Sequence, residues 1–155
     1  MRTFAPVGDT PILRENLTRD HLSAISAITL DGKLFFNVQD DAFKGPDVVK
    51  FLRHLLRCIP GKLCVIWDGN PIHRAQVVKD FLATRAGRRV HLERLPGYAP
   101  ELNPDEYVWT HLKHVEMKNL CCRDIEHLRI ELRNGVKRLR EKPHIVRGFK
   151  DGVGL

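Results

Sequence analysis

The stretch KLCVIWDGNPIH, residues 62–73, decides the fold of this 155-residue chain. Its apolar run Leu63–Trp67 is rich in β-branched and aromatic residues, which predicts a short buried strand. Asp68 follows where the strand stops and a Gly-Asn turn begins. Its carboxylate is therefore expected at the carboxyl end of a strand, the edge at which open α/β sheets bind their ligands.

A second stretch, LPGYAPELNPDEYVW at residues 95–109, carries further carboxylates. Its prolines and glycine disfavour regular structure as far as Asn103, where an N-cap residue followed by proline predicts the start of a helix. Glu106 then stands in the first helical turn. The same Asn-Pro pair precedes His73, so both stretches are expected to deliver a polar side chain at the opening of a helix.

The remaining sequence predicts alternating strands and helices. Apolar runs at 21–30 and 33–38, separated by an Asp-Gly pair, are typical of an antiparallel hairpin. A further short strand is predicted at 89–93, and helical spacing predicts helices at 46–58, 71–84, 104–118 and 124–141. This order indicates an α/β domain with a mixed sheet flanked by helices.

The domain is predicted to occupy residues 21–142. Residues 1–20 carry prolines, a glycine and several charges, which favours an extended lead-in. Pro143 and the glycines after it are expected to end the ordered structure, so residues 143–155 are interpreted as a C-terminal tail.

The composition favours a polyanionic partner. Lys and Arg number 26 against 19 Asp and Glu, a formal charge of +7, so nucleic acid is the first expectation and an acidic membrane surface the second. The sequence shows neither a secretion signal nor a long apolar run, so no membrane span is expected. Cys58 and Cys64 fall in a helix pattern and a strand pattern, as buried reduced thiols of a cytoplasmic protein would.

Asp68 and Glu106 each have an ordinary interpretation. Asp68 can be a turn former, and Glu106 can close a capping box with Asn103. The pair is more informative than either residue alone, because the 37 residues between them suffice for a helix, a strand and a loop that return the chain to the same sheet edge. The two carboxylates are then expected to converge there. Converging carboxylates suit Mg²⁺ or Mn²⁺, and pairs of such ions stabilise in-line phosphoryl transfer.

Other candidates have stronger structural explanations. His111 and His114, with Glu116 nearby, suggest a zinc site, but no further ligands stand at the required spacing. Tyr107 and Trp109 suit base stacking, yet aromatics in the first turns of a helix over a sheet are more often core, and core is the preferred interpretation.

Two features suit contact with phosphate. His73, close to Asp68, can bind a phosphate or tune the site, or it can be a helix-surface histidine. One face of the last predicted helix is basic, which is consistent with either backbone-phosphate contact or a solvated flank. That face carries Arg129, Arg133, Lys137 and Arg140.

Together the two stretches resemble the DDE transposases of the mariner superfamily, closest to their bacterial insertion-sequence branch. The specific part is the Pro-Glu-Leu-Asn-Pro block with its trailing aromatic pair, residues 100–109, and the Ala-Pro-x-Gly lead-in at 5–8 extends it. The resemblance implies a ribonuclease-H-like fold in which three carboxylates bind two Mg²⁺ or Mn²⁺ ions, cleave DNA at a transposon end and join it to target DNA. Asp68 matches the second carboxylate and metal ligand, and Glu106 the third.

The sequence differs from the family's pattern at the first of the three carboxylates. In the family the first Asp lies on an opening, central strand upstream of the lead-in, and Asp9 and Asp20 do not match it by motif. The fold is therefore expected to lack that strand, leaving two strand edges unpaired. The family's upstream helix-turn-helix domain is expected to be absent as well. We expect an N-terminally truncated catalytic domain that is inactive alone.

Two functions follow as hypotheses. The first is a catalytic-domain fragment of a DDE-type transposase, whose complete parent performs Mg²⁺-dependent DNA cleavage and strand transfer. The second is a non-catalytic DNA-binding or dimerising remnant, with DNA, a second copy or an intact transposase as partner. A different ribonuclease-H-like nuclease is disfavoured by the Pro-Glu-Leu-Asn-Pro block.

Overall fold

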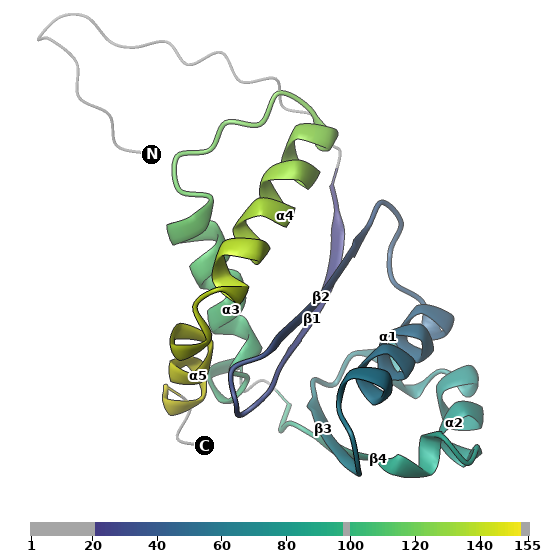
Figure 1. The fold of residues 1–155 in the computed structure, drawn as a ribbon. Coiled ribbons are helices and arrows are strands. Elements are labelled where there is room, and N and C mark those ends of the chain that lie inside the picture. Colours follow the sequence, from purple (N-terminus) through teal and green to yellow (C-terminus); the bar gives the residue numbers. More distant parts are fainter. Residues whose placement is uncertain (1–20, 98–99, 153–155) are drawn as a thin grey trace, which may run out of the picture.

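The computed structural model describes residues 21–97 and 100–152, so the predicted lead-in lies outside the described residues. Four strands and five α-helices make up most of this part, joined by three short 3₁₀ segments and one π-helical segment (Figure 1). The strands are β1 (Ser23–Ile28), β2 (Leu34–Gln39), β3 (Leu63–Trp67) and β4 (Val90–Arg94). The α-helices are α1 (Gly45–Cys58), α2 (Gln76–Ala83), α3 (Asp105–His111), α4 (Ile125–Arg140) and α5 (Pro143–Asp151).

The predicted hairpin is present. β1 and β2 pair antiparallel, with Ser23 opposite Gln39 and Ile28 opposite Leu34. Gly32 closes the turn with a φ of 88°, a left-handed conformation that glycine adopts without steric cost. β3 and β4 form a separate parallel pair, with Leu63 opposite Val90. The α/β class is thus confirmed, and within the described residues the strands form two small sheets.

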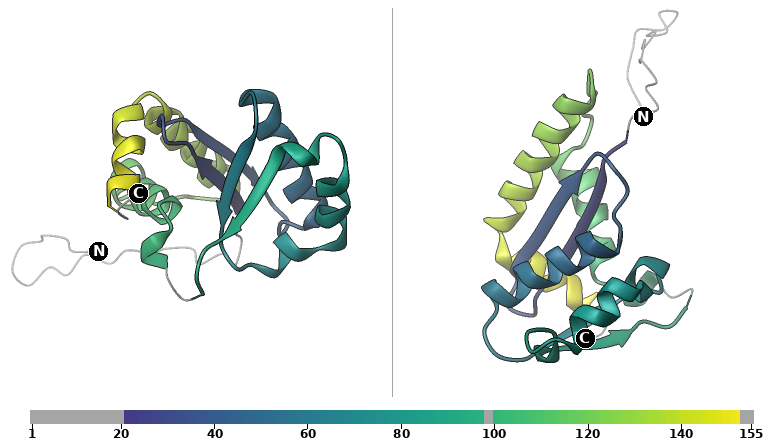
Figure 2. Two further views of the ribbon diagram at one scale, coloured as in Figure 1. Left: turned by 90° about the horizontal axis from the view of Figure 1, so that it is seen from below. Right: turned by 90° about the vertical axis from the view of Figure 1, so that its right-hand side faces the viewer.

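The hairpin is buried on both faces, because side chains alternate along each strand. One face of β2 sends Phe35 into a core with α1 and α2, where Val48, Leu52 and Val78 are almost fully buried. The opposite face sends Leu34 into a second core. Its buried members are Val108, Leu112, Leu132, Val136, Leu139 and Val146. Figure 2 shows the hairpin between the two groups of helices, with β3 and β4 beside α1 and α2.

Two predicted helices are interrupted. The helix expected at 71–84 begins as a 3₁₀ turn, Pro71–Arg74, and Ala75 is extended before α2 starts. The helix expected at 104–118 is α3 followed by a π-helical segment, Leu112–Glu116. None of the helices in the described part of the chain is long and apolar enough to cross a membrane.

The expectation that order ends at Pro143 is wrong, because this proline is in the first turn of α5. Proline suits that position, since its missing N–H has no helical partner there and its φ is already helical. Val146 of α5 is fully buried in the second core. The expected burial of Cys58 and Cys64 is also wrong. Both are exposed, because one lies on the outer face of α1 and the other on the uncovered face of β3.

Candidate functional site

Asp68 lies at the carboxyl end of β3, as the sequence predicts. Its Oδ1 accepts a hydrogen bond from the Asn70 N–H at 3.0 Å and lies 3.0 Å from Nε2 of His73. The turn-forming role is therefore real, but it occupies one oxygen. Among the described residues, Oδ2 has no recorded partner, and the side chain is 57% exposed. The residue can stabilise its turn and still offer an oxygen to a cation.

His73 is held firmly beside Asp68. Its ring stacks on Trp67 with centroids 4.3 Å apart, and its side chain is only 13% exposed. Burial lowers the pKa of His73, and the charge of Asp68 opposes that shift. The interpretation as a helix-surface histidine is wrong, because the ring packs against the end of β3. A neutral ring that donates from Nε2 fixes the orientation of the Asp68 carboxylate.

Glu106 stands in the first turn of α3, and the expected capping box is not formed. The helix has no side-chain cap at its N-terminus, and Asn103 Oδ1 instead accepts from the Asp105 N–H at 3.2 Å. Glu106 is exposed. Its carboxylate has no hydrogen bond or ion pair with any residue that the structure describes, so it is available to a ligand.

The neighbouring Asp105 is the site residue that sequence reasoning missed. Its Oδ2 accepts a 2.6 Å hydrogen bond from Ser26 Oγ of β1, which ties α3 to the hairpin. Burial raises the pKa of Asp105 to about 6; bonds from Ser26 and Trp109 oppose this, and the nearby charges of Glu106 and Asp68 add to it. The partners Ser26 and Asp105 are 79 residues apart, so no local pattern signals the contact.

These side chains line one cavity. It has a volume of about 220 Å³ and lies between β1, the end of β3 and the start of α3. Its polar lining includes Asp68, His73, Asp105 and Glu106. The structure therefore brings the two predicted carboxylates to one place, with a histidine and a buried carboxyl beside them.

The donor set suits a hard divalent cation in part. Asp68 and Glu106 offer carboxylate oxygens, the ligand type that Mg²⁺ and Mn²⁺ prefer. Asp105 is less suited, because Ser26 already occupies one of its oxygens. No group of three or more His, Cys, Asp or Glu side chains within residues 21–97 and 100–152 is arranged to hold a metal. Asp68 and Glu106 are thus the two side chains of the cavity that offer oxygens for a cation.

Arg94, at the end of β4, places positive charge against Gly69, the residue that follows Asp68. A Cβ built on Gly69 would lie 2.7 Å from Arg94 Nη2, so the guanidinium covers the glycine that follows Asp68. A side chain at position 69 would displace the guanidinium from this place. The parallel register places Arg94 opposite Trp67 at the same sheet edge. Sequence reasoning missed Arg94 because its proximity depends on that register.

One histidine of the suggested zinc site, His111, contacts a buried carboxylate of the fold. His111 Nε2 lies 3.4 Å from Glu116 Oε1, and the same carboxylate binds Arg138 at 2.6 Å and Lys142 at 2.9 Å. His114 is exposed. The Glu116 carboxylate, 4% exposed, is thus held by three basic groups. Trp109 packs against Phe36 with centroids 5.5 Å apart, which confirms its core role, whereas the core interpretation of Tyr107 is wrong because that side chain is exposed.

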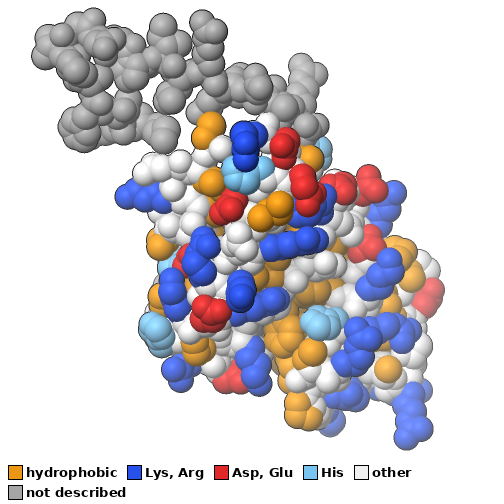
Figure 3. All heavy atoms as spheres, turned by 45° about the horizontal axis from the view of Figure 1, so that its top comes forward, with side chains coloured by type: hydrophobic (Ala, Val, Ile, Leu, Met, Phe, Trp, Pro, Cys, Tyr) orange, Lys and Arg blue, Asp and Glu red, His pale blue; other side chains and the backbone are white. Residues whose placement is uncertain are grey.

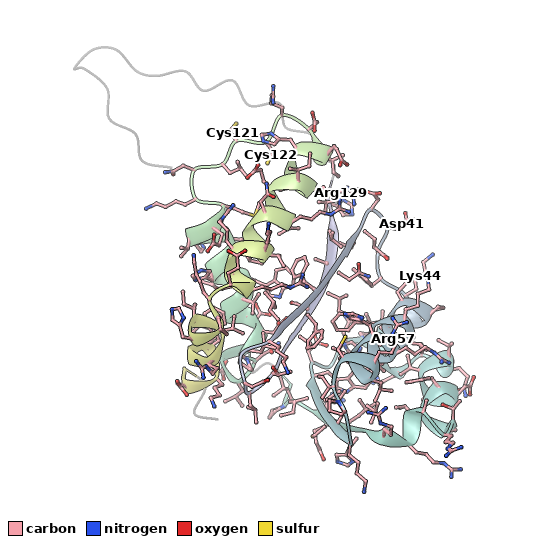
Figure 4. All side chains as sticks on the ribbon, viewed as in Figure 1. Asp41, Lys44, Arg57, Cys121, Cys122 and Arg129 are labelled. Atoms are coloured by element: carbon pink, nitrogen blue, oxygen red, sulfur yellow. The ribbon has the colours of Figure 1, made fainter. Side chains whose placement is uncertain are left out.

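The predicted basic face of α4 is partly used within the fold. Arg129 pairs with Asp40 and Glu126, and Arg140 donates to the Leu34 carbonyl at 2.9 Å. Figure 4 shows Arg129 reaching from α4 toward the segment after β2 that carries Asp41. Arg133 and Lys137 remain exposed. Figure 3 shows Lys and Arg side chains spread over this side of the molecule, mixed with acidic ones.

Comparisons with known proteins agree with this geometry. A family model described as a DDE superfamily endonuclease matches residues 1–129. Three solved structures, each 17% identical, cover 97% of the chain. They are a Mos1 transposase paired-end complex with the left transposon end, the Mos1 strand transfer complex, and a Mos1 mariner paired-end complex with Mn, with TM-scores of 0.60, 0.61 and 0.60.

This likeness confirms the ribonuclease-H-like fold. The chain covers 50%, 49% and 50% of these three solved chains, so it spans about half their length. No curated protein matches the chain.

Proposed function

The chain belongs to the DDE superfamily endonuclease family, and from this premise we propose that it is a fragment of the catalytic domain of a DDE-type transposase. The substrate is DNA, at a transposon end and at a target, and the parent enzyme belongs to the bacterial insertion-sequence branch of the mariner superfamily. The observation that carries the proposal is the convergence of Asp68 and Glu106 on one cavity.

Each residue has a role in this proposal. Asp68 and Glu106 hold the divalent cation, Mg²⁺ or Mn²⁺, as the second and third carboxylates of the family's set. When bound, the ion supplies positive charge that stabilises the attacking and leaving oxygens of the phosphodiester. His73 keeps the Asp68 carboxylate oriented, and Asp105 fixes the first turn of α3, which carries Glu106, against β1. Arg94 and the exposed Arg133 and Lys137 attract the DNA backbone.

Manganese binding tests the assignment of the ligands. We expect titration calorimetry to detect Mn²⁺ binding to the wild-type chain, and Asp68→Asn and Glu106→Gln each to weaken it by at least about tenfold, because each removes a charged oxygen ligand. Asp41→Asn is the matched control, since Asp41 lies on the segment after β2 (Figure 4) and does not line the cavity. Equal affinity in all four proteins would contradict the assignment.

The second hypothesis, a non-catalytic DNA-binding or dimerising remnant, is favoured by one observation: the described residues assemble no three-ligand metal group. The same titration separates the two functions. A chain that binds duplex DNA in a salt-dependent manner but shows no Mn²⁺ binding at Asp68 and Glu106 is the remnant. Its partners are DNA and a second copy of the chain or an intact transposase.

A further inference from the structure

The positive charge of the chain is concentrated in two segments. Residues 48–67 and 81–92 hold seven Lys and Arg and no Asp or Glu, so they account for the whole formal charge of +7. The first segment comprises most of α1 and all of β3, and the second runs from the end of α2 into β4. In Figure 3 the lower right of the molecule, where α1 and α2 lie, carries many Lys and Arg side chains and few acidic ones.

Arg89 joins the two segments at one end of the domain. Its guanidinium donates to the carbonyls of Gly61 at 2.8 Å, Ile59 at 3.0 Å and Leu56 at 3.3 Å. These carbonyls lie at and just beyond the C-terminus of α1, where helical donors run out. The parallel register also sets the starts of β3 and β4 side by side. The turn between α2 and β4 is therefore fixed against the end of α1.

Arg57 stands on the side of α1 that faces α2 (Figure 4). One turn earlier on α1, the Arg53 guanidinium lies 4.9 Å from the centre of the Phe81 ring of α2. Residues four positions apart share one face of a helix, so Arg57 is directed to the same side, one turn closer to the end of α1. Its side chain is exposed and forms no ion pair with a described residue.

Three more basic side chains stand next to the contacts of Arg89. Lys62 directly follows Gly61, and Arg85 and Arg88 lie in the helical turn that leads to Arg89. Because Arg85 and Arg88 are three positions apart in that turn, they lie on the same side of it. All three side chains are exposed, and none forms an ion pair with a described residue. Their positive charges are thus free for an external anion.

We propose that these exposed side chains bind the phosphate backbone of a DNA duplex. They are called the basic junction and comprise Arg57, Lys62, Arg85 and Arg88. Because a strand rises about 3.3 Å per residue, Asp68 lies about 20 Å from Lys62, at the opposite end of β3. The junction therefore holds different phosphates from those that reach the carboxylates, and it needs no metal. The choice of DNA as the polyanion rests on the proposed function.

The composition of the junction fits DNA better than an acidic membrane. Three of its four side chains are arginine, whose planar guanidinium can donate two parallel hydrogen bonds to one phosphate. A membrane-surface site also presents exposed apolar side chains that enter the lipid. The large apolar side chains that are exposed in the described part of the chain lie elsewhere, and Ile66, the nearest in sequence, is toward the other end of β3.

DNA binding without metal tests the junction. The probe is a fluorescent duplex of arbitrary sequence, titrated with the chain in EDTA at low and at high salt. Each phosphate contact contributes about −0.9 to the slope of log affinity against log salt. Lys62→Gln combined with Arg88→Gln should therefore make the slope shallower by about 1.8 and weaken binding at low salt by at least about tenfold.

A second double variant is the matched control. Lys33→Gln combined with Arg147→Gln removes the same charge from two exposed positions at the hairpin turn and on α5, and should leave the slope unchanged. An equal loss of slope in both double variants would assign binding to net charge and overturn the proposal. Polyglutamate or vesicles of an anionic phospholipid that compete as strongly as unlabelled duplex would overturn it as well.

The assay contains no metal, so its outcome is separate from that of the Mn²⁺ titration. Duplex binding that depends on the basic junction, without Mn²⁺ binding, would keep the surface and remove the metal site. Mn²⁺ binding at Asp68 and Glu106 without duplex binding in EDTA would keep the metal site and overturn the surface.

Discussion

Gly32→Ala should lower the free energy of unfolding by about 3 kcal/mol, the larger of two effects on stability expected for single substitutions. Gly32 has a φ of 88°, which costs alanine about 1–2 kcal/mol. A Cβ there would also lie 2.3 Å from the Pro143 carbonyl oxygen, so α5 has to move away from the hairpin turn. Urea denaturation measures the loss, and faster amide exchange at Val146 reports the displacement of α5.

Gly61→Ala is the matched control. Gly61 has a similar φ of 80°, but a Cβ there meets no atom within 4 Å. It should cost only the conformational penalty, about 1 kcal/mol. An equal loss in the two variants would show that the contact between the turn and α5 does not contribute to stability.

Glu116→Gln should cost about 2–3 kcal/mol at pH 7. Burial opposes ionisation of this carboxyl, but bonds from Arg138, Lys142 and His111 outweigh burial and lower the pKa of Glu116 from 4.5 to about 2. A shift of that size corresponds to about 3 kcal/mol, and the partly exposed positions of Arg138 and Lys142 reduce it through solvent screening. Glutamine keeps the shape of the side chain and removes the charge.

The pH dependence identifies the cause. Because the folded pKa lies below the unfolded value, ionised Glu116 stabilises the fold above about pH 4.5, and this contribution is lost as the pH falls toward 2. The difference in unfolding free energy between wild type and Glu116→Gln should therefore shrink between pH 7 and about pH 3. A difference that is the same at both values would assign the loss to packing rather than charge.

The sequence predicted those features that depend on local patterns. β3 was predicted with its exact bounds, and the hairpin was located because an Asp-Gly turn separates two apolar runs. Asp68 was placed at the end of a strand and Glu106 at the start of a helix, where the structure has them. These features reflect the conformational preferences of a few neighbouring residues, so one sequence is enough to find them.

Features that depend on distant contacts escaped prediction. α5 was missed because Pro143 was interpreted as the end of the ordered structure. Burial of Val146 in the second core instead favours a further helix. The partnership of Ser26 with Asp105 depends on the packing of α3 against β1. Arg94 lies against Gly69 only through the parallel register of β3 and β4. No periodicity in the sequence encodes these contacts.

Metal-directed cleavage of the polypeptide tests the central claim, that Asp68 and Glu106 hold one cation, most directly. Fe²⁺ replaces Mg²⁺, and with ascorbate and peroxide it generates radicals that cut the backbone next to the bound ion. Mass spectrometry of the fragments should show breaks beside Asp68 and beside Glu106, suppressed by excess Mg²⁺ and absent in Asp68→Asn. Breaks only near His111 and His114, or a pattern unchanged by Asp68→Asn, would contradict the claim.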